Sequence, residues 1–320
     1  MTIRKNKLTM TRSILHNGDT VALIAPAGVI TEQKLSNSIK NLEDLGLKPI
    51  YFKTIANQLG YLAGDDRRRA SELNEMYHDK SVKAILCVRG GYGSMRILDL
   101  IDYSLIKANP KPLIGYSDIT ALHNAIYLKT KQIGFHGVLG AELFSIYTRE
   151  AFEAIFFDDS EWIILKQYKD HKQSAFTVTT GKVEGTLIGG NLSLLTSLIG
   201  TKYDFDWKGK IIYIEEVSEP AYKIDRMLTQ LIMAGKFSQI KGILFGQFHN
   251  CDGDNMDLSK NISIKELLIE KIKPLNIPAC YGFSFGHIPN PTILPVGAHV
   301  EFDADNIQIK FKRSELKDFL

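Results

Sequence analysis

A serine stands where a short apolar run changes into a helical pattern. The apolar pair at 113–114 is followed by Gly-Tyr-Ser-Asp at 115–118, and apolar residues then recur at helical spacing. A sharp strand–turn–helix corner can hold a serine Oγ in the open as a nucleophile, and the amide of Asp118 would then face a developing oxyanion. The segment departs from Gly-x-Ser-x-Gly because Ile119 stands at the last position. From this segment alone, Ser117 as a helix cap is the simpler interpretation.

A nucleophilic serine needs a base and a carboxylate that orients the base. Among eight histidines, His136 in Gly-Phe-His-Gly and His287 in Phe-Gly-His-Ile-Pro lie in Gly-bounded loops at the ends of apolar runs. Both are candidates for the base. For the carboxylate, the apolar run at 211–214 is followed by Glu215 and Glu216. Taken alone, this acidic pair is most simply the solvated end of a strand.

A glycine-rich segment, Arg-Gly-Gly-Tyr-Gly at 89–93, follows the strongest apolar run of the first half. Glycines in such a loop let backbone amides approach a ligand closely. The spacing fits neither Gly-x-Gly-x-x-Gly nor a Walker loop, so a phosphate site is disfavoured. Because the loop comes one predicted strand before Ser117, a second oxyanion donor is the better interpretation.

Short apolar runs rich in β-branched residues alternate with helical spacing from residue 20 to about 137. This alternation is typical of a doubly wound parallel sheet that is covered on both faces. The predicted strands are 21–25, 49–52, 82–88, 112–115 and 133–135, and the predicted helices are 32–45, 66–78, 94–102 and 118–129.

The second half mixes shorter strands with helices, and an irregular stretch separates it from the first half. We therefore expect an α/β protein with an N-terminal doubly wound domain, 1–157, and a C-terminal mixed α/β domain, 158–320. The predicted strands are 185–188, 210–214, 242–245, 298–302 and 307–311, and the predicted helices are 150–157, 191–199, 222–234 and 263–271.

Composition excludes several classes of protein. The chain has 39 basic and 36 acidic residues among 320, a formal charge of +3, and the signs are mixed, which gives no electrostatic case for nucleic acid. The densest basic cluster, 67–69, is interpreted as a solvated helix face. Cysteines at 87, 251 and 280 are too far apart for a zinc motif or disulfide framework. The acidic segment 249–257 lacks the closing Glu of a calcium loop and is interpreted as solvated.

No stretch approaches the roughly 20 apolar residues of a membrane span. The basic segment 1–10 is not followed by an apolar core of signal-peptide length, so we interpret it as a short lead and expect a cytoplasmic protein. A homodimer is an option that the sequence neither favours nor excludes.

The chain resembles the LD-carboxypeptidases, a serine peptidase family that also contains the microcin C immunity peptidases. The motifs occur in the family's order and span residues 20 to 303. They are Arg-Gly-Gly-Tyr-Gly, Gly-Tyr-Ser-Asp, Gly-Gly-Asn-Leu-Ser-Leu-Leu, Ile-Glu-Glu-Val-Ser-Glu-Pro-Ala-Tyr-Lys-Ile-Asp-Arg-Met-Leu and Phe-Gly-His. Several motifs in register are far more specific than any one of them.

The resemblance implies a triad with Ser117 as nucleophile, His287 as base and Glu215 as its carboxylate. It also implies an oxyanion hole from the amides of Asp118 and Gly91. Because the serine lies in the first half and its partners in the second, the active site is expected between the two domains. Pockets are common at such interfaces.

The resemblance leaves His136 without a catalytic role, and it places Glu216 where the family often has Asp. Arg89 is our candidate for binding a substrate carboxylate. No metal or cofactor is implied. The implied reaction removes the terminal D-alanine from a murein tetrapeptide, by cutting the bond between an L-centre and a D-residue during cell-wall recycling.

Two other functions stay open at this stage. A microcin-type immunity peptidase would cleave an acyl-sulfamoyl nucleotide and would need an aromatic platform for the base, which the sequence does not reveal. A non-catalytic protein of the same fold would bind a small molecule without becoming acylated on serine.

Overall fold

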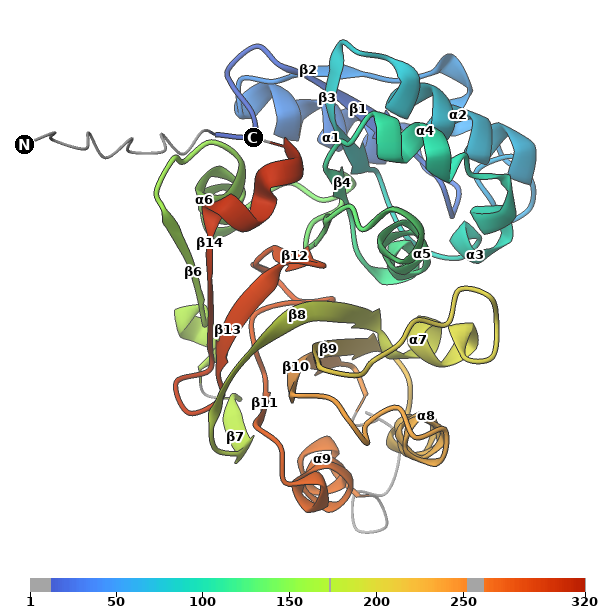
Figure 1. Ribbon diagram of the computed structural model, residues 1–320. Helices are drawn as coiled ribbons and strands as arrows, with labels where there is room; N and C mark the ends of the chain where they lie inside the picture. Colours follow the sequence, from blue (N-terminus) through green and yellow to red (C-terminus); the bar gives the residue numbers. More distant parts are fainter. Residues whose placement is uncertain (1–12, 173, 252–261, 320) are drawn as a thin grey trace, which may run out of the picture.

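Two β-sheets organise the chain, one above the other in Figure 1. The computed structural model describes residues 13–172, 174–251 and 262–319. The N-terminal lead and most of the acidic segment 249–257 lie outside the described residues.

The first sheet has six strands in the order β12-β5-β4-β3-β1-β2. β1 to β5 pair in parallel, and β12 is antiparallel to β5. The strands are β1 (Thr20–Ile24), β2 (Lys48–Ile50), β3 (Val82–Cys87), β4 (Leu113–Ile114), β5 (Gly134–His136) and β12 (Leu294–Val296). The helices of this part are α1 (Glu32–Asp44), α2 (Asp66–His78), α3 (Ser94–Ile97), α4 (Tyr103–Ala108), α5 (Thr120–Thr130) and α6 (Ile146–Phe156).

Both faces of this sheet are buried, as the continuous apolar runs predict. Within β1, Val21 and Leu23 belong to one core with residues of α1 and α6. Ala22 and Ile24 belong to a second core with residues of α2, α4 and α5. Because side chains alternate along a strand, helices must cover both faces to keep such a run from water. The predicted doubly wound arrangement is confirmed.

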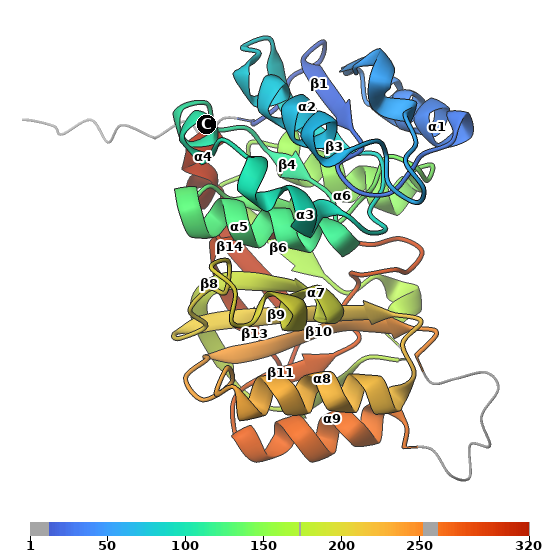
Figure 2. The ribbon, with the colours of Figure 1, turned by 90° about the vertical axis from the view of Figure 1, so that its right-hand side faces the viewer.

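The second sheet has eight strands in the order β6-β14-β13-β8-β9-β10-β11-β7. β8 to β11 form a parallel centre, and antiparallel strands flank it on both sides. Helices α8 and α9 lie side by side on the face turned away from the first sheet (Figure 2). The strands are β6 (Trp162–Lys166), β7 (Phe176–Thr179), β8 (Lys182–Asn191), β9 (Lys210–Val217), β10 (Gly242–His249), β11 (Ala279–Tyr281), β13 (His299–Asp303) and β14 (Gln308–Lys312), and the helices are α7 (Leu192–Leu198), α8 (Ala221–Met233) and α9 (Ile264–Ile272).

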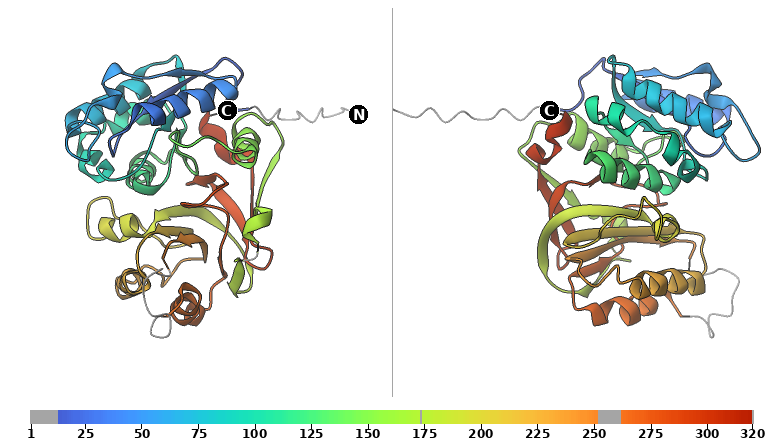
Figure 3. Two further views of the ribbon diagram at one scale, coloured as in Figure 1. Left: turned by 180° about the vertical axis from the view of Figure 1, so that it is seen from behind. Right: turned by 45° about the vertical axis from the view of Figure 1, so that its right-hand side comes forward.

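The two parts are joined by more than the crossing near residue 157. β12 comes from the second half of the chain but completes the first sheet, and the C-terminal turn 313–319 lies beside α6 (Figures 1 and 3). Arg313 is fully buried there, and its guanidinium donates to the carbonyls of Ile155, Ala154 and Ser160 at 2.8, 2.8 and 2.9 Å. The boundary at 157 stays a prediction.

Two local predictions need correction. The helix predicted over 94–102 consists of α3 and a 3₁₀ turn at 98–100, after which the Asp102 side chain caps the separate helix α4. The solvated face predicted at 67–69 is wrong for Arg69, whose side chain is 0% exposed. Its guanidinium finds buried backbone carbonyls as partners, which spacing along the chain does not reveal.

Candidate active site

Ser117 lies at a strained corner between β4 and α5. Its φ is +65°, which is rare and costly for a residue with a side chain, and it begins the 3₁₀ turn η3 (Ser117–Ile119). Gly115 permits the turn, because a Cβ there would lie 3.1 Å from both Cys87 Cβ and Ile119 Cγ1. The N-cap residues of η3 and α5 are Tyr116 and Ile119, and neither makes a side-chain capping hydrogen bond. The interpretation of Ser117 as a helix cap is therefore wrong.

Three side chains from distant parts of the chain form a continuous hydrogen-bonded series at this corner. The Oγ of Ser117 lies 3.0 Å from Nε2 of His287, and Nδ1 of His287 lies 2.8 Å from Oε2 of Glu215. The glutamate side chain is fully buried, and that of His287 is 21% exposed. The ring of Tyr116 packs edge-on against the imidazole, with centroids 4.9 Å apart. This is the arrangement of a nucleophile, a base and an orienting carboxylate.

The two glutamates have separate environments. β9 continues to Val217, so Glu215 and Glu216 lie within the strand and point to opposite faces. Glu216 is 2% exposed and accepts hydrogen bonds from Asn191 Nδ2, from the amide and hydroxyl of Ser193, and from the Val217 amide. The interpretation of this pair as a solvated strand end is therefore wrong. Only Glu215 contacts the histidine.

His136, the other candidate base, is packed inside the protein. It is completely buried, and neither ring nitrogen has a hydrogen-bond partner among the described residues. Burial lowers its pKa well below the usual value, and the nearby histidines 123 and 287 lower it further. Its ring packs against those of Tyr116 and Tyr213, with centroids 5.8 and 5.0 Å apart. His136 therefore serves packing at this corner, and the bond to Ser117 is made by His287.

The sequence matches known proteins over most of its length. Residues 21–137 match the LD-carboxypeptidase N-terminal domain, and residues 184–302 match the LD-carboxypeptidase C-terminal domain. The chain belongs to the LD-carboxypeptidase family. It is 41% identical over 289 residues to the probable murein peptide carboxypeptidase of Bacillus subtilis, covering 89% of this chain and 88% of that protein.

A member of the family with a different named role is also similar to this chain. The microcin C7 self-immunity protein MccF of Escherichia coli is 30% identical over 93% of this chain and 94% of its own length. A solved structure of MccF in complex with glutamyl sulfamoyl guanosine superposes with a TM-score of 0.83 at 26% identity, covering 95% of this chain and 98% of that one. Family membership thus indicates a peptidase but does not determine its substrate.

The glycine-rich loop lies against Ser117, as the order of the strands predicts. A Cβ added to Gly90 would be 2.9 Å from Ser117 Cβ and 3.2 Å from the Asp118 amide nitrogen. Gly91 follows with φ +106°, a conformation that suits glycine. The amides predicted to form an oxyanion hole, those of Gly91 and Asp118, therefore come from adjoining backbone segments.

Arg89 begins the same loop. Its guanidinium donates to the carbonyl of Val29 at 2.8 Å, and a Cβ placed on Gly91 would lie 3.2 Å from its Nη2. The cation thus borders the predicted oxyanion loop. Its role in binding a substrate carboxylate stays a prediction.

A cavity of about 510 Å³ opens beside the histidine. It is lined by Tyr116, Glu142, Phe144, His249, His287 and Pro289, among others. This volume suits a small peptide better than a protein substrate. Among residues 13–172, 174–251 and 262–319, no group of three or more metal-ligating side chains could hold a metal ion. In the same part of the chain, every helix is too short or too polar to cross a membrane.

Proposed function

We propose that this protein is a serine carboxypeptidase that hydrolyses the L,D bond to the terminal D-alanine of a murein tetrapeptide. The observation that carries the proposal is the series Ser117–His287–Glu215, with the serine held at φ +65°. The similarity to a murein peptide carboxypeptidase supports the choice of substrate. A cytoplasmic role in cell-wall recycling belongs to the same proposal, because the family resemblance implies it.

The proposed reaction follows from the geometry. Ser117 Oγ attacks the carbonyl carbon of the scissile bond while its proton passes to His287 Nε2, and Glu215 stabilises the resulting imidazolium. The carbonyl oxygen becomes an oxyanion that accepts hydrogen bonds from the amides of Asp118 and Gly91. When the C–N bond breaks, the departing D-alanine amine takes the proton from His287. Water then hydrolyses the acyl-enzyme with the same base, and Ser117 regains its proton.

A test of this function is mass spectrometry of the purified protein incubated with L-Ala-γ-D-Glu-diaminopimelate-D-Ala. We expect the loss of one alanine, and no loss with the isomer that ends in L-alanine. If unlabelled protein leaves the tetrapeptide intact while a separate sample of it reacts with a covalent serine probe, the assignment of the substrate is contradicted.

The second candidate is cleavage of a glutamyl sulfamoyl nucleotide. The observation in its favour is the fold similarity to MccF in complex with glutamyl sulfamoyl guanosine. Offering that compound in the same assay separates the two candidates, because release of glutamate without release of D-alanine from the tetrapeptide would favour the immunity-type activity.

The pH dependence of kcat/KM should report His287. Burial lowers the pKa of this imidazole, but the hydrogen bond and charge of Glu215 outweigh burial, and the net shift is upward from 6.5. Because His287 must be neutral to accept a proton, kcat/KM should be lost as pH falls through this raised pKa. The acid-limb midpoint should therefore lie above 6.5. In Glu215→Gln it should move to lower pH, and an unchanged midpoint would mean that another group controls the rate.

A further inference from the structure

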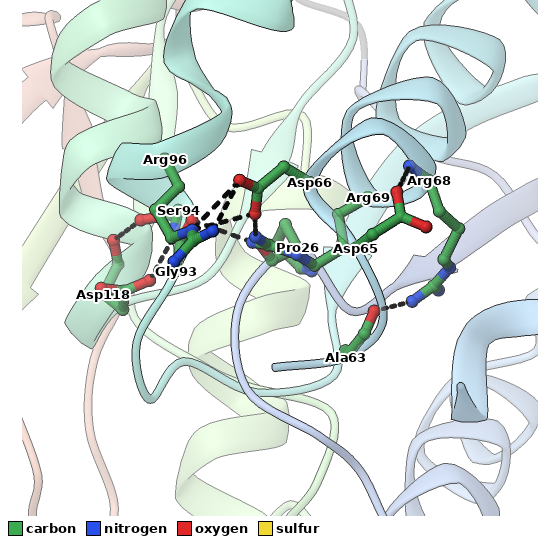
Figure 4. A network of polar contacts seen from close by, with 10 residues as sticks. All are labelled: Pro26, Ala63, Asp65, Asp66, Arg68, Arg69, Gly93, Ser94, Arg96 and Asp118. Carbon is green, nitrogen blue, oxygen red and sulfur yellow. Dashed lines mark hydrogen bonds and ion pairs between the residues drawn. The ribbon is translucent and has the colours of Figure 1, made fainter. Parts of the chain in front are cut away.

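Arg69 lies beneath the glycine-rich loop with its charge enclosed in the protein. The residue is 1% exposed, and Nη1 donates to the carbonyls of Pro26 and Gly93 at 2.5 and 2.9 Å. Nη2 pairs with Asp66, which also binds Arg96 on the surface. Figure 4 shows this guanidinium between the loop that follows β1 and the end of the glycine-rich loop. Burying a cation is costly unless such partners compensate it, so its place needs a reason.

The glycine-rich loop is held at both ends by these contacts. At its start, the Gly28 amide donates to the Gly90 carbonyl at 3.1 Å. At its end, Arg69 binds the Gly93 carbonyl, and a Cβ on Gly93 would lie 2.8 Å from Nη1. Gly91, whose amide is a predicted oxyanion donor, lies between the two fastened ends.

The second predicted donor is tied to the same contacts. Ser94, the residue after the loop, donates from its amide to Asp118 Oδ2 at 2.8 Å and from its hydroxyl to the Asp118 carbonyl at 2.5 Å. Asp118 is 1% exposed, and burial raises the pKa of its carboxyl despite the bonds from Ser94. A continuous buried series therefore runs from Arg69 through Gly93 and Ser94 to Asp118 (Figure 4).

We propose that Arg69 is a positioning residue for the oxyanion hole, holding the amides of Gly91 and Asp118 through Gly93 and Ser94. This inference rests on the proposed function. An oxyanion hole requires its donors at about 2.7–3.1 Å from the developing charge, so a small displacement of either amide reduces transition-state stabilisation. The hydrogen-bond partners of the Arg69 guanidinium among the described residues are Pro26, Gly93 and Asp66, so it would act on the reaction only through the loop. Its loss should lower kcat and leave KM near the wild-type value.

Arg313 offers a matched control for the loss of a buried guanidinium. It is 0% exposed and likewise donates to backbone carbonyls, but those carbonyls belong to the last turn of α6 and to Ser160 after it, not to the glycine-rich loop. If Arg69 served only stability, Arg69→Met and Arg313→Met would differ from the wild type in the same way, through the folded fraction alone.

The experiment compares Arg69→Met, Arg69→Lys and Arg313→Met. Two quantities are measured per folded protein: kcat and KM on the tetrapeptide, and the rate constant for labelling of Ser117 by a fluorophosphonate probe. We expect Arg69→Met to lower kcat and the labelling rate constant by about 10²–10³-fold, the effect of losing one oxyanion donor. Arg69→Lys keeps a cation but loses the guanidinium that binds the carbonyls of Pro26 and Gly93. Its kcat and labelling rate constant should lie between those of the wild type and Arg69→Met. Arg313→Met should lower thermal stability and keep kcat.

Several outcomes would overturn the proposal. A wild-type kcat in folded Arg69→Met would overturn it. Equal losses of kcat in Arg69→Met and Arg313→Met would overturn it too, because Arg69 would then contribute only to stability. If Arg69→Met does not fold, Arg69→Lys carries the same test. A wild type that labels on Ser117 but spares the tetrapeptide would contradict only the proposed substrate, and labelling would still test Arg69. A wild type that does not label would remove the proposed function and this inference together.

Discussion

Replacing Ser117 with alanine is expected to lower turnover about 10⁶-fold, the size of loss seen when the nucleophile of another serine peptidase is removed. The hydroxyl supplies the atom that attacks the carbonyl, and no other hydroxyl lies within hydrogen-bond distance of His287 among the described residues. Release of D-alanine from the tetrapeptide, followed by mass spectrometry, measures the effect. Ser104→Ala, on the exposed side of α4, is the matched control and should keep full activity.

Ser117→Gly adds an independent check. Glycine adopts φ +65° without the cost of about 1–3 kcal/mol that a residue with a side chain carries there. This variant should be inactive but no less stable than the wild type, which would show that the strain serves the chemistry. For the alanine variant, near-normal turnover would contradict the assignment of Ser117 as the nucleophile.

Glu215→Gln is expected to lower kcat about 10⁴-fold, by analogy with the aspartate-to-asparagine change in another serine triad. The carboxylate accepts from Nδ1 of His287 at 2.8 Å, which keeps Nε2 free to accept the serine proton. An amide at this position can donate to Nδ1 and so favours the tautomer whose Nε2 is already protonated. Steady-state rates on the tetrapeptide at the pH optimum measure the effect.

Glu216→Gln is the control for this change, since the neighbouring carboxylate is equally buried but points away from His287. An amide cannot accept all the bonds that Asn191, Ser193 and Val217 donate, so stability should fall. Turnover should fall far less than in Glu215→Gln. The reverse order of effects would transfer the catalytic role to Glu216.

Much of the first half was predictable because its signals are local. The apolar runs marked β1 and β3 to within two residues, and the helical spacing marked α1 and α2. The strands β6, β7, β11 and β12 were missed. The last three have only three or four residues, and all four pair with a partner far along the chain. Spacing along a short strand does not identify its neighbour, and β12 in particular crosses back to the first sheet.

The candidate site was predictable only through several motifs together. Ser94 and Arg69, which tie the glycine-rich loop to Asp118, were missed as site residues. Ser94 directly follows the glycine-rich loop in the sequence, and this position could have indicated its role. Arg69 lies in a charged helical segment whose pattern predicts a solvated face. Only its neighbours in the tertiary structure show that it is buried.

The sequence by itself determined the parallel α/β class, the corner at Ser117 and the glycine-rich loop one strand before it. These follow from periodicity and backbone preference, which act over a few residues. The residues alone left His136 and Glu216 open beside His287 and Glu215, and the family resemblance favoured the latter pair. Only the tertiary structure brings His287 to Ser117 and Glu215 to His287. The serine and its base are 170 positions apart, so their contact forms only when the two sheets pack together, and no local pattern encodes that packing.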